Sequence, residues 1–324
     1  MFTMRFTMRS AAADPGSRAD SYAAMLDMAA WAETRGGLAA ILSQHHGAED
    51  GYLPSPVPAA AAIAARTSSL PIMVAALILP FYEPVKLAED LAVVDLMSRG
   101  RVSYVIGLGY RDEELAMFGV DRGARGRLAE ERIGVLRRLW AGERVRVDGR
   151  WARITPAPFT PGGPVLCYGG GTEAAARRAG RLGMMFVAET HDAGLEAAYR
   201  DAAERAGVAA APGCLIQPPG VPLTVFVADD PGRAWAELGP YLLMDATSYR
   251  QWNAGRPGTA SVSAATSVAE LRAEQGPYRI LTPAQAAGYI GQGIPLALQP
   301  LLGGLAPDVA WRYLEAAASA GRVT

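Results

Sequence analysis

Cysteine and histidine are scarce in this chain. Its 324 residues include two cysteines, Cys167 and Cys214, and three histidines. Two cysteines in a chain of this length do not form a disulfide framework, and their spacing matches no thiolate metal motif. We therefore expect a protein of a reducing compartment, the cytoplasm, and we predict no metal site.

Runs of basic residues and long apolar runs are also absent. The net charge is −1 and both signs are dispersed, so the chain lacks the basic footprint that nucleic acid or an anionic membrane requires. The most apolar stretch, residues 70–82, contains two prolines and is too short to cross a bilayer. Residues 1–9 alternate apolar and polar residues, which is typical of a strand and not of a signal peptide. We expect no nucleic-acid or membrane partner, and a small molecule as ligand.

The chain is rich in apolar residues, and predicted strands and helices alternate along it. Half of its residues are hydrophobic and 19% are charged, which allows a large core. In the first half, predicted strands alternate with amphipathic helical segments, and this alternation favours a parallel sheet. The strands are residues 38–42, 72–79 and 102–108, and the helices are residues 18–35, 57–66 and 84–97.

Further strands are predicted at residues 165–168, 184–188, 223–227 and 296–301. Together with the N-terminal strand they give eight, so we predict an α/β fold, a (β/α)8 TIM barrel in one domain over residues 1–324. An open doubly wound sheet has the same local signals and remains the alternative. A β-hairpin is predicted at residues 144–154 around Asp148-Gly149, and a long irregular loop at residues 249–278, which include Gly255 and Pro257.

Two adjacent histidines follow the predicted strand 38–42 directly. Barrel enzymes place catalytic groups at the carboxyl ends of their strands. His45 and His46 are therefore candidate catalytic residues, because a histidine there can exchange a proton near neutral pH or donate a hydrogen bond to a developing anion. The alternative is a structural pair that holds the following loop.

Glycines follow two further strands. Gly107 and Gly109, with Tyr110 behind them, come after strand 102–108, where small residues let the backbone approach a flat ligand. An isolated Gly-x-Gly is also typical of a tight turn, and no third glycine completes a dinucleotide fingerprint.

The second glycine run, Gly169, Gly170 and Gly171, leads through Thr172 into a predicted helix at residues 173–182. Amides at a helix N-terminus bind phosphate, and the threonine hydroxyl can cap the helix or join them. A capped helix after a loose turn is the alternative interpretation. The run lacks the lysine of a P-loop, so hydrolysis of a nucleoside triphosphate is not indicated.

The order and spacing of several motifs resemble the luciferase-like flavin monooxygenases, a family that shares its fold with reductases using the deazaflavin coenzyme F-420. The resemblance covers almost the whole chain and is densest between residues 38 and 140. The motifs that carry it are residues 45–56, 79–84, 87–90, 95–101 and 107–110.

By position, the resemblance makes His45 the family's active-site histidine beside the flavin ring. Ala75 and Ala76 match the place where members often hold a non-prolyl cis peptide against the flavin. Gln44 stands where many members have an acidic residue, so a carboxylate partner for the histidine is missing at that position.

The remaining matched positions concern the cofactor. Residues 107–110 align with the loop near flavin and substrate, Arg127 with an arginine that helps to hold the cofactor phosphate, and residues 169–172 with the phosphate turn. Leu108 replaces a cationic residue of some luciferase relatives, which removes one possible phosphate contact.

The resemblance implies a flavoprotein oxidoreductase, a monooxygenase that uses reduced FMN and oxygen on a small organic substrate entering from the side of residues 249–278. A separate flavin reductase is expected to supply the reduced flavin, because no nicotinamide fingerprint is present. One alternative is a hydride-transfer enzyme dependent on coenzyme F-420. The other is a non-catalytic flavin-binding subunit, of which Gln44 is a possible sign.

The resemblance also implies a homodimer, because members of the family commonly pair through the helices predicted here at residues 57–66 and 84–97. Both helices have wide apolar faces, more than one barrel-facing stripe requires. The alternative is that neighbouring helices of the same barrel cover the additional apolar surface.

Overall fold

A computed structural model describes residues 1–10, 14–254, 256 and 258–320. Its main feature is a parallel ten-stranded sheet in the order β11-β10-β12-β1-β2-β3-β4-β7-β8-β9. β1 pairs with both β2 and β12, so the first and last strands lie side by side. The strands are β1 (Phe2–Phe6), β2 (Gly37–Leu42), β3 (Ile72–Ile78), β4 (Val102–Gly107), β7 (Val165–Gly170), β8 (Met185–Ala188), β9 (Cys214–Leu215), β10 (Thr224–Val227), β11 (Tyr278–Leu281) and β12 (Leu296–Leu298).

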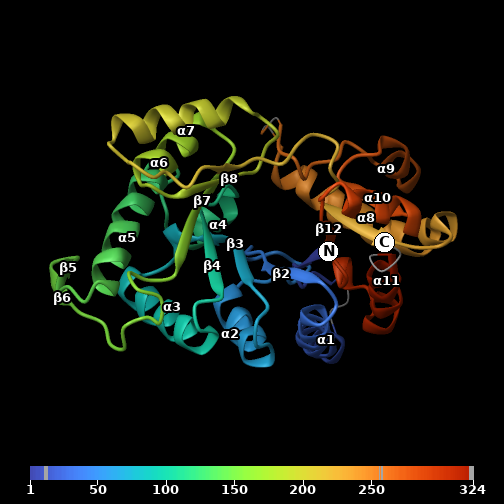
Figure 1. Cartoon of the computed structure of the whole chain (residues 1–324), viewed down its shortest axis with the longest axis horizontal. Helices are drawn as coiled ribbons and strands as arrows, with labels where there is room; N and C mark the ends of the chain where they lie inside the picture. The colour runs from blue at the N-terminus through green and yellow to red at the C-terminus, as the bar shows by residue number, and fades with distance from the viewer. Residues whose placement is uncertain (11–13, 255, 257, 321–324) are drawn as a thin grey trace.

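Helices surround the strands, as Figure 1 shows. In Figure 1, residues 165–205 lie above residues 102–140 on the left, residues 231–252 and 268–320 form the right side, and β12 returns to the N-terminal strand. The helices are α1 (Pro15–Glu33), α2 (Pro56–Arg66), α3 (Pro84–Ser98), α4 (Asp112–Met117), α5 (Arg125–Trp140), α6 (Glu173–Arg181), α7 (Gly194–Arg205), α8 (Pro231–Trp252), α9 (Val268–Glu274), α10 (Pro283–Gly291) and α11 (Pro307–Ala320), with short 3-10 turns at Leu79–Phe81 and Leu302–Gly304.

The alternating burial of residues along β1 explains how this strand of the sheet packs against the helices. Phe2, Met4 and Phe6 are almost fully buried, whereas the residues between them are partly exposed. The ring of Phe2 lies 5.8 Å from that of Trp31 in α1, so one face of the strand packs on the helix layer. Gly36 adopts a positive φ of 83°, which lets the chain reverse between α1 and β2.

The predicted (β/α)8 barrel is confirmed, and β3 and β4 begin at the predicted residues. Two strands were missed. β9 has only two residues, too few for a readable alternation, and β11 follows directly on Gly276-Pro277, which had indicated a loop. The predicted hairpin is confirmed as the antiparallel pair β5 (Val145–Val147) and β6 (Arg150–Ala152).

The irregular loop predicted at residues 249–278 was wrong in part. α8 continues to Trp252, and α9 occupies much of the second half of the segment. The hydroxyl of Ser267 accepts a hydrogen bond from the N–H of Glu270, a helix cap that the nearby glycine and proline content had obscured. Gly255 and Pro257 lie outside the described residues.

The helices predicted to pair in a dimer bury most of their apolar residues inside this chain. Ala60, Ile63 and Leu91 are fully buried. On α3, Leu96 and Met97 remain 39% and 49% exposed. Most of the apolar surface that suggested a dimer is therefore covered by the barrel itself, and the dimer remains a prediction. In the part of the chain that is described, no helix is both long enough and apolar enough to traverse a lipid bilayer.

Glu33 joins α1 to the segment that leads into β3. Its Oε1 atom accepts hydrogen bonds from the N–H groups of Ser68, Ser69 and Leu70 at 2.8, 2.5 and 2.8 Å. Partial burial disfavours the carboxylate, but these bonds outweigh it and lower the pKa of Glu33 to about 2.

We expect Glu33→Gln to lower the free energy of unfolding at pH 7 by about 1 kcal/mol, because charged acceptors form the stronger hydrogen bonds. A depressed pKa stabilises the fold above the unfolded value of 4.5, and this contribution is lost as the pH falls towards 2. Urea unfolding at pH 7 and pH 3 measures it, with Glu49→Gln as an exposed control. A difference between wild type and Glu33→Gln that stays constant with pH would contradict the role of the charge.

Candidate functional site

Three neighbouring strand ends bring together most of the residues predicted to touch flavin or substrate. His45 and His46 follow β2, and residues 107–110 begin at the last residue of β4. Between them, in β3, the peptide bond from Ala75 to Ala76 is cis, as the resemblance implied. The pairings of β3 with β2 and with β4 place all three segments at one end of the barrel.

Two glycines allow this end to pack closely. A Cβ atom at Gly107 would lie 2.8 Å from the Cβ of Ala76, so a larger residue would push the loop away from the cis segment. Gly109 has a positive φ of 75°, and a Cβ there would lie 3.1 Å from Cγ2 of Ile78. The predicted tight approach of this loop therefore has a structural basis independent of any ligand.

His45 is bonded on both ring nitrogens. Its Nδ1 lies 2.8 Å from Oε1 of Glu114, and its Nε2 lies 3.2 Å from the hydroxyl of Tyr110. A carboxylate can only accept, so Nδ1 carries the proton and Nε2 of the neutral ring accepts from the tyrosine. The imidazole is 8% exposed.

Burial is the main cause that lowers the pKa of His45, and the positive charges of Arg111 and Arg9 act in the same direction. The hydrogen bond and charge of Glu114 oppose them without reversing the shift. Burial would raise the pKa of Glu114, but its bonds from His45 and the backbone N–H of His46, with the charge of Arg111, lower it. Near neutral pH the ring is therefore neutral and oriented by an anion.

Glu114 supplies the carboxylate that is missing at Gln44. It reaches His45 from α4, and its Oε1 also accepts from the N–H of His46 at 2.7 Å and from Nη1 of Arg111 at 3.1 Å. The sequence alone did not identify it, because it lies 69 positions from the histidine. The sequence did hold one signal for Glu114, which is its position as an acidic residue in the helix that follows the loop at Gly107.

Gln44 orients His46 and not His45. Its amide nitrogen lies 2.7 Å from Nε2 of His46 and donates to the hydroxyl of Tyr82 at 2.9 Å. Its amide oxygen accepts from the N–H of Ile78 at 2.9 Å. The His46 ring packs against Phe118 with a centroid separation of 4.6 Å. His46 is thus held beside the site by contacts separate from those of His45, and its catalytic role remains a prediction.

Aromatic residues that were not predicted form a wall beside His45. The ring centroids of Tyr52 and of Trp252, the last residue of α8, each lie 4.8 Å from that of His45. The guanidinium carbons of Arg9 and Arg111 lie 4.8 and 4.4 Å from the Trp252 ring. Two cations therefore contact one indole, an arrangement that fixes the wall.

Arg9 itself is fully buried within a charged network. Its Nη1 donates to Asp245 at 2.6 Å and its Nε to Asp50 at 2.7 Å. Asp245 also accepts from the hydroxyl of Tyr278 at 2.8 Å. Burial raises the pKa of Asp245 despite these bonds. The network links the segment after β1 to α8 and β11, and Arg9 also contacts Trp252 of the aromatic wall.

The glycine run forms the predicted turn between β7 and α6. Thr172 is the N-cap of α6 and accepts from the N–H of Ala175 at 3.3 Å, so the capping interpretation is correct. A Cβ at Gly169 would lie 2.9 Å from Val105, and one at Gly171 would lie 2.7 Å from Thr190. Packing therefore requires small residues here, while the first helical turn still presents amides that could bind an anion.

The structure does not place Arg127 together with the other residues predicted to bind the cofactor. Its side chain is 74% exposed on α5 and pairs with Glu131 at 3.0 Å. Arg125 is more buried: its half-buried guanidinium experiences the charges of Arg122, Arg256 and Asp112, and Nε has no hydrogen-bond partner among the described residues. Burial and the two like charges lower the pKa of Arg125.

Arg256 connects the two halves of the site. Its guanidinium carbon lies 4.4 Å from the centre of the Tyr110 ring, and it forms an ion pair with Glu189. Glu189 follows β8, and its N–H donates to the carbonyl of Gly170 at 3.0 Å. The glycine turn and the His45 site therefore lie on one continuous set of contacts.

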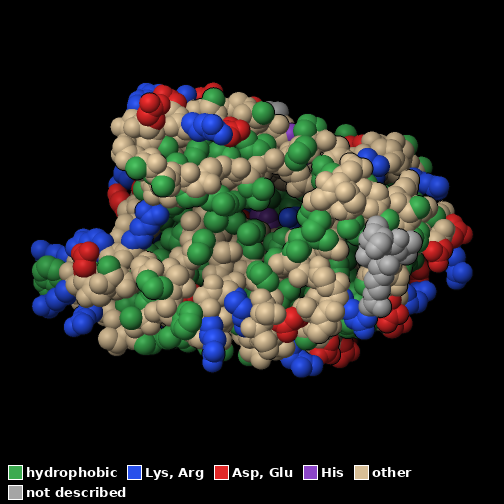
Figure 2. All heavy atoms as spheres, in the orientation of Figure 1, with side chains coloured by type: hydrophobic (Ala, Val, Ile, Leu, Met, Phe, Trp, Pro, Cys, Tyr) green, Lys and Arg blue, Asp and Glu red, His purple; other side chains and the backbone are tan. Residues whose placement is uncertain are grey.

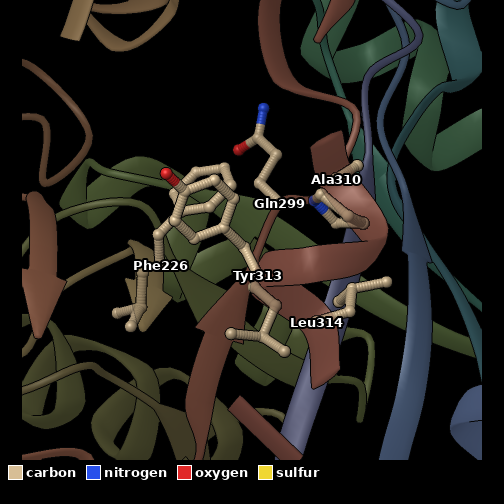
Figure 3. A pocket seen from close by; sticks show the side chains of 8 residues that line it. Phe226, Gln299, Ala310, Tyr313 and Leu314 are labelled. Carbon is tan, nitrogen blue, oxygen red and sulfur yellow. The ribbon is translucent and has the colours of Figure 1, made fainter. Parts of the chain in front are cut away.

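The molecular surface is hollowed on the face shown in Figure 2, with a histidine and a basic side chain at the floor and hydrophobic side chains around it. An open cavity of about 240 Å³ includes His191 in its lining. The pocket in Figure 3, between β10, β12 and α11, has about 10 Å³, and Phe226 and Tyr313 pack beside it. That is space for about one water molecule, too little for an organic substrate.

The sequence model of one protein family, described as luciferase-like monooxygenase, matches residues 2–287. The limonene 1,2-monooxygenase of Rhodococcus erythropolis is 31% identical over 148 residues, which cover 40% of this chain and 38% of that enzyme. An uncharacterised protein of Mycobacterium tuberculosis is 29% identical over 183 residues, 55% of this chain and 64% of the relative. The chain matches less than two thirds of the length of either relative.

Solved structures share the fold. A monooxygenase from Streptomyces bottropensis has a TM-score of 0.70 at 21% identity, with 98% of each chain covered. The oxygenating constituent of 3,6-diketocamphane monooxygenase from Pseudomonas putida, in complex with FMN, has a TM-score of 0.71 at 16% identity, covering 98% of this chain and 96% of that one. An F-420-dependent secondary alcohol dehydrogenase has a TM-score of 0.58 at 18% identity, covering 87% and 93%.

Proposed function

Because the chain belongs to the luciferase-like monooxygenase family, we propose that it uses reduced FMN and molecular oxygen to oxidise a small organic substrate. The observation that carries this proposal is the series of hydrogen bonds from Glu114 through His45 to Tyr110. It lies at the ends of β2 and β4, beside the cis bond in β3.

The cationic surroundings of the glycine turn fit the phosphate of FMN. Nε of Arg125 has no hydrogen-bond partner among the described residues, and a phosphate oxygen would give it one. Its cationic neighbours Arg122 and Arg256 are themselves paired with Asp112 and Glu189. The N-terminal turn of α6 offers backbone amides, and Thr172 caps that turn. We assign the phosphate to Arg125 and this turn in place of Arg127.

When bound, the reduced flavin supplies the electrons and reacts with oxygen. Burial is the main cause that raises the pKa of Tyr110, so its hydroxyl keeps its proton at neutral pH. Rotation of this hydroxyl redirects the proton from Nε2 of His45 towards negative charge that develops in the site, and leaves Nε2 as an acceptor. Tyr52 and Trp252 limit the access of water to His45.

A second candidate function is hydride transfer with coenzyme F-420. The observation that favours it is the neutral state of His45, since Nε2 could accept the proton that an alcohol loses on oxidation. The intact series of bonds at His45 argues against the third possibility, a non-catalytic flavin-binding subunit.

Labelling with ¹⁸O₂ tests the first function. Protein, reduced FMN and a mixture of small alcohols, ketones and terpenes are exposed to the labelled gas, and products are analysed by mass spectrometry. One ¹⁸O atom in a product supports the monooxygenase. Oxidation of an alcohol without oxygen, coupled to reduction of F-420, would contradict it and support hydride transfer.

We also propose that a separate flavin reductase supplies reduced FMN and that the enzyme is a cytoplasmic homodimer. The exposed Leu96 and Met97 on α3 support the dimer. Light scattering at micromolar concentration measures the mass of the assembly, and a strictly monomeric mass would count against the dimer.

We expect Gly171→Asp to weaken binding of FMN by at least about a hundredfold, because it places a negative charge where the phosphate would meet the N-terminus of α6. The new Cβ also approaches Thr190 and Glu189, so Gly171→Ala is the matched control for that crowding. Flavin titration of both variants measures the effect. If the alanine and aspartate variants bound FMN equally well, the phosphate assignment would be wrong.

A further inference from the structure

Every hydrogen-bonding group of the Gln44 side chain has a partner. The N–H of Ile78, at the end of β3, donates to Oε1 at 2.9 Å. Because a main-chain N–H can only donate, this bond identifies the oxygen of the amide and directs the NH2 group the other way. One proton of the NH2 group is donated to the hydroxyl of Tyr82 at 2.9 Å. Nε2 of His46 lies 2.7 Å from the same nitrogen and faces the other proton.

These bonds determine where His46 carries its ring proton. An amide NH2 group does not accept hydrogen bonds, so Nε2 of His46 is the acceptor and the proton lies on Nδ1. A second proton on Nε2 would place two donors 2.7 Å apart, so Gln44 opposes the charged form of the ring. Burial is the main cause that lowers the pKa of His46, and His45 acts in the same direction against the charge of Glu114. The ring is therefore neutral near neutral pH.

Neither side chain can turn over without losing hydrogen bonds. Gln44 is 3% exposed, and reversal of its amide would direct the NH2 group at the N–H of Ile78. A flip of the imidazole would put a ring carbon opposite Gln44 and leave one amide proton without an acceptor. The ring also packs against Phe118 and Phe81, with centroid separations of 4.6 and 5.6 Å. The hydrogen bond from Gln44 to His46 thus has one stable direction.

The neighbouring His45 has a different kind of partner on its Nε2. The hydroxyl of Tyr110, 3.2 Å away, can turn and accept, so it tolerates a proton on that nitrogen. The carboxylate of Glu114, which accepts from Nδ1, also favours the charged ring. The two adjacent histidines therefore share a tautomer, but of the two only His45 has partners that allow a second proton.

His46 is joined to the His45 network through its main chain. Its N–H donates to Oε1 of Glu114 at 2.7 Å, and its carbonyl accepts from Nη1 of Arg111 at 3.0 Å. Among the described residues, the ionisable groups around His46 are His45, Glu114, Arg111 and, beyond the Gln44 amide, Tyr82. A positive charge on His46 would therefore act on the carboxylate that orients His45.

We propose that Gln44 is a positioning residue: it keeps His46 a neutral imidazole with its proton on Nδ1, so that of the two adjacent histidines only His45 takes up a proton during turnover. The tautomer of His46 follows from the hydrogen bonds alone. The role of His45 in turnover rests on the proposed oxidoreductase function, so the two parts are tested separately.

NMR of protein labelled with ¹⁵N-histidine measures the tautomer, because ring nitrogens with and without a proton have well-separated chemical shifts. The chain has three histidines, and single replacements by phenylalanine assign their signals. We expect His46 to show a protonated Nδ1 and an unprotonated Nε2, and to become charged only as the pH falls below the ordinary value of 6.5. A protonated Nε2 on His46 near neutral pH would overturn the proposal.

Gln44→Glu keeps the acceptor for Ile78 but replaces the donor that faces His46 by a second acceptor. Nε2 of His46 should then carry a proton near neutral pH, and the pKa of His46 should rise above 6.5, because an adjacent carboxylate favours the charged ring. Gln292→Glu adds the same charge at an exposed position after α10 and should leave the His46 signals unchanged. Unchanged His46 signals in Gln44→Glu would overturn the role of the glutamine.

Gln44→Met has a similar length without hydrogen-bonding groups and should release the His46 ring into a mixture of both tautomers. Melting temperatures show whether each variant is folded. If Gln44→Glu does not fold, the wild-type spectrum and Gln44→Met still decide the tautomer. A single Nδ1–H tautomer that persists in Gln44→Met would show that Gln44 does not select it.

Reoxidation of bound reduced FMN by oxygen, followed by absorbance at each pH, tests the part that rests on the proposed function. In Gln44→Glu the rate should change by at least about threefold across the pKa that NMR gives for His46, because the new charge acts on Glu114. The wild-type rate should stay constant over the same range. Identical pH profiles would overturn this part.

The two assignments can fail separately. FMN binding and reoxidation, together with a proton on Nε2 of His46 in the wild type, would overturn the role of Gln44 and leave the flavin function intact. The expected ¹⁵N pattern in a protein that binds neither FMN nor F-420 would support the tautomer and overturn the function on which the role of His45 rests.

Discussion

Replacing His45 by alanine should lower kcat by at least about a hundredfold while FMN remains bound, the usual effect of removing a positioned acid or base. The neutral imidazole, oriented by Glu114, holds the hydroxyl of Tyr110 at 3.2 Å. Without the imidazole, the hydroxyl of Tyr110 loses the acceptor at Nε2 that positions its proton for the developing charge. Stopped-flow turnover with saturating substrate measures kcat, and flavin titration measures binding.

Tyr110→Phe and Glu114→Gln test the same series of bonds from its two ends. Both should lower kcat more than they weaken FMN binding. Because burial and nearby cations lower the pKa of His45, the wild-type rate should stay constant near neutral pH and fall only as the pH drops below the ordinary histidine value of 6.5. Near-normal turnover of His45→Ala would show that the histidine is structural.

Replacing Arg9 by methionine should lower the free energy of unfolding by about 3–5 kcal/mol, the usual cost of breaking a buried ion pair by removing one partner. Arg9 has no exposed side-chain surface, and Asp245 has 1%. The substitution leaves Asp245 with the hydroxyl of Tyr278 but without its counterion. Urea unfolding monitored by circular dichroism gives the difference.

Two further variants show whether the loss of stability in Arg9→Met comes from the broken ion pair or from the smaller side-chain volume. Adding Asp245→Asn to Arg9→Met removes the uncompensated charge and should recover a substantial part of the stability. Arg66→Met breaks the exposed pair with Asp27, in which both side chains are more than half exposed, and should cost less than about 1 kcal/mol. Equal losses for Arg9→Met and Arg66→Met would contradict the account.

The sequence predicts the barrel because the information for it is local. Apolar alternation and helical periodicity occur within single segments, and glycine or proline marks their ends, as at Gly36 before β2 and Pro84 in α3. Two strands were missed. The residue pattern of β9 is too short to be recognised, and β11 comes directly after a turn signal. Ser267 shows the opposite error, a helix cap hidden within an apparent loop.

The candidate residues that the sequence itself indicated are those that follow a strand end directly, and the cis bond between Ala75 and Ala76 came from the family resemblance. His45 and the glycine turn fall at such positions, whereas Arg9 and Asp245 meet across 236 positions and no periodicity relates them. The family resemblance indicated Arg127, whereas Arg125, two positions earlier, faces the cationic cluster because helical residues two positions apart point in different directions. Burial, which separates the two arginines, is a property of the folded chain.

Binding of the two coenzymes, compared on one preparation, tests the central claim most directly. The protein is titrated anaerobically with reduced FMN and with reduced F-420, and each dissociation constant is determined for wild type and for Gly171→Asp. The account predicts that FMN binds at least about tenfold more tightly than F-420, a difference of about 1.4 kcal/mol, and that Gly171→Asp removes this binding. Tighter binding of F-420, or FMN affinity that does not respond to Gly171→Asp, would contradict it.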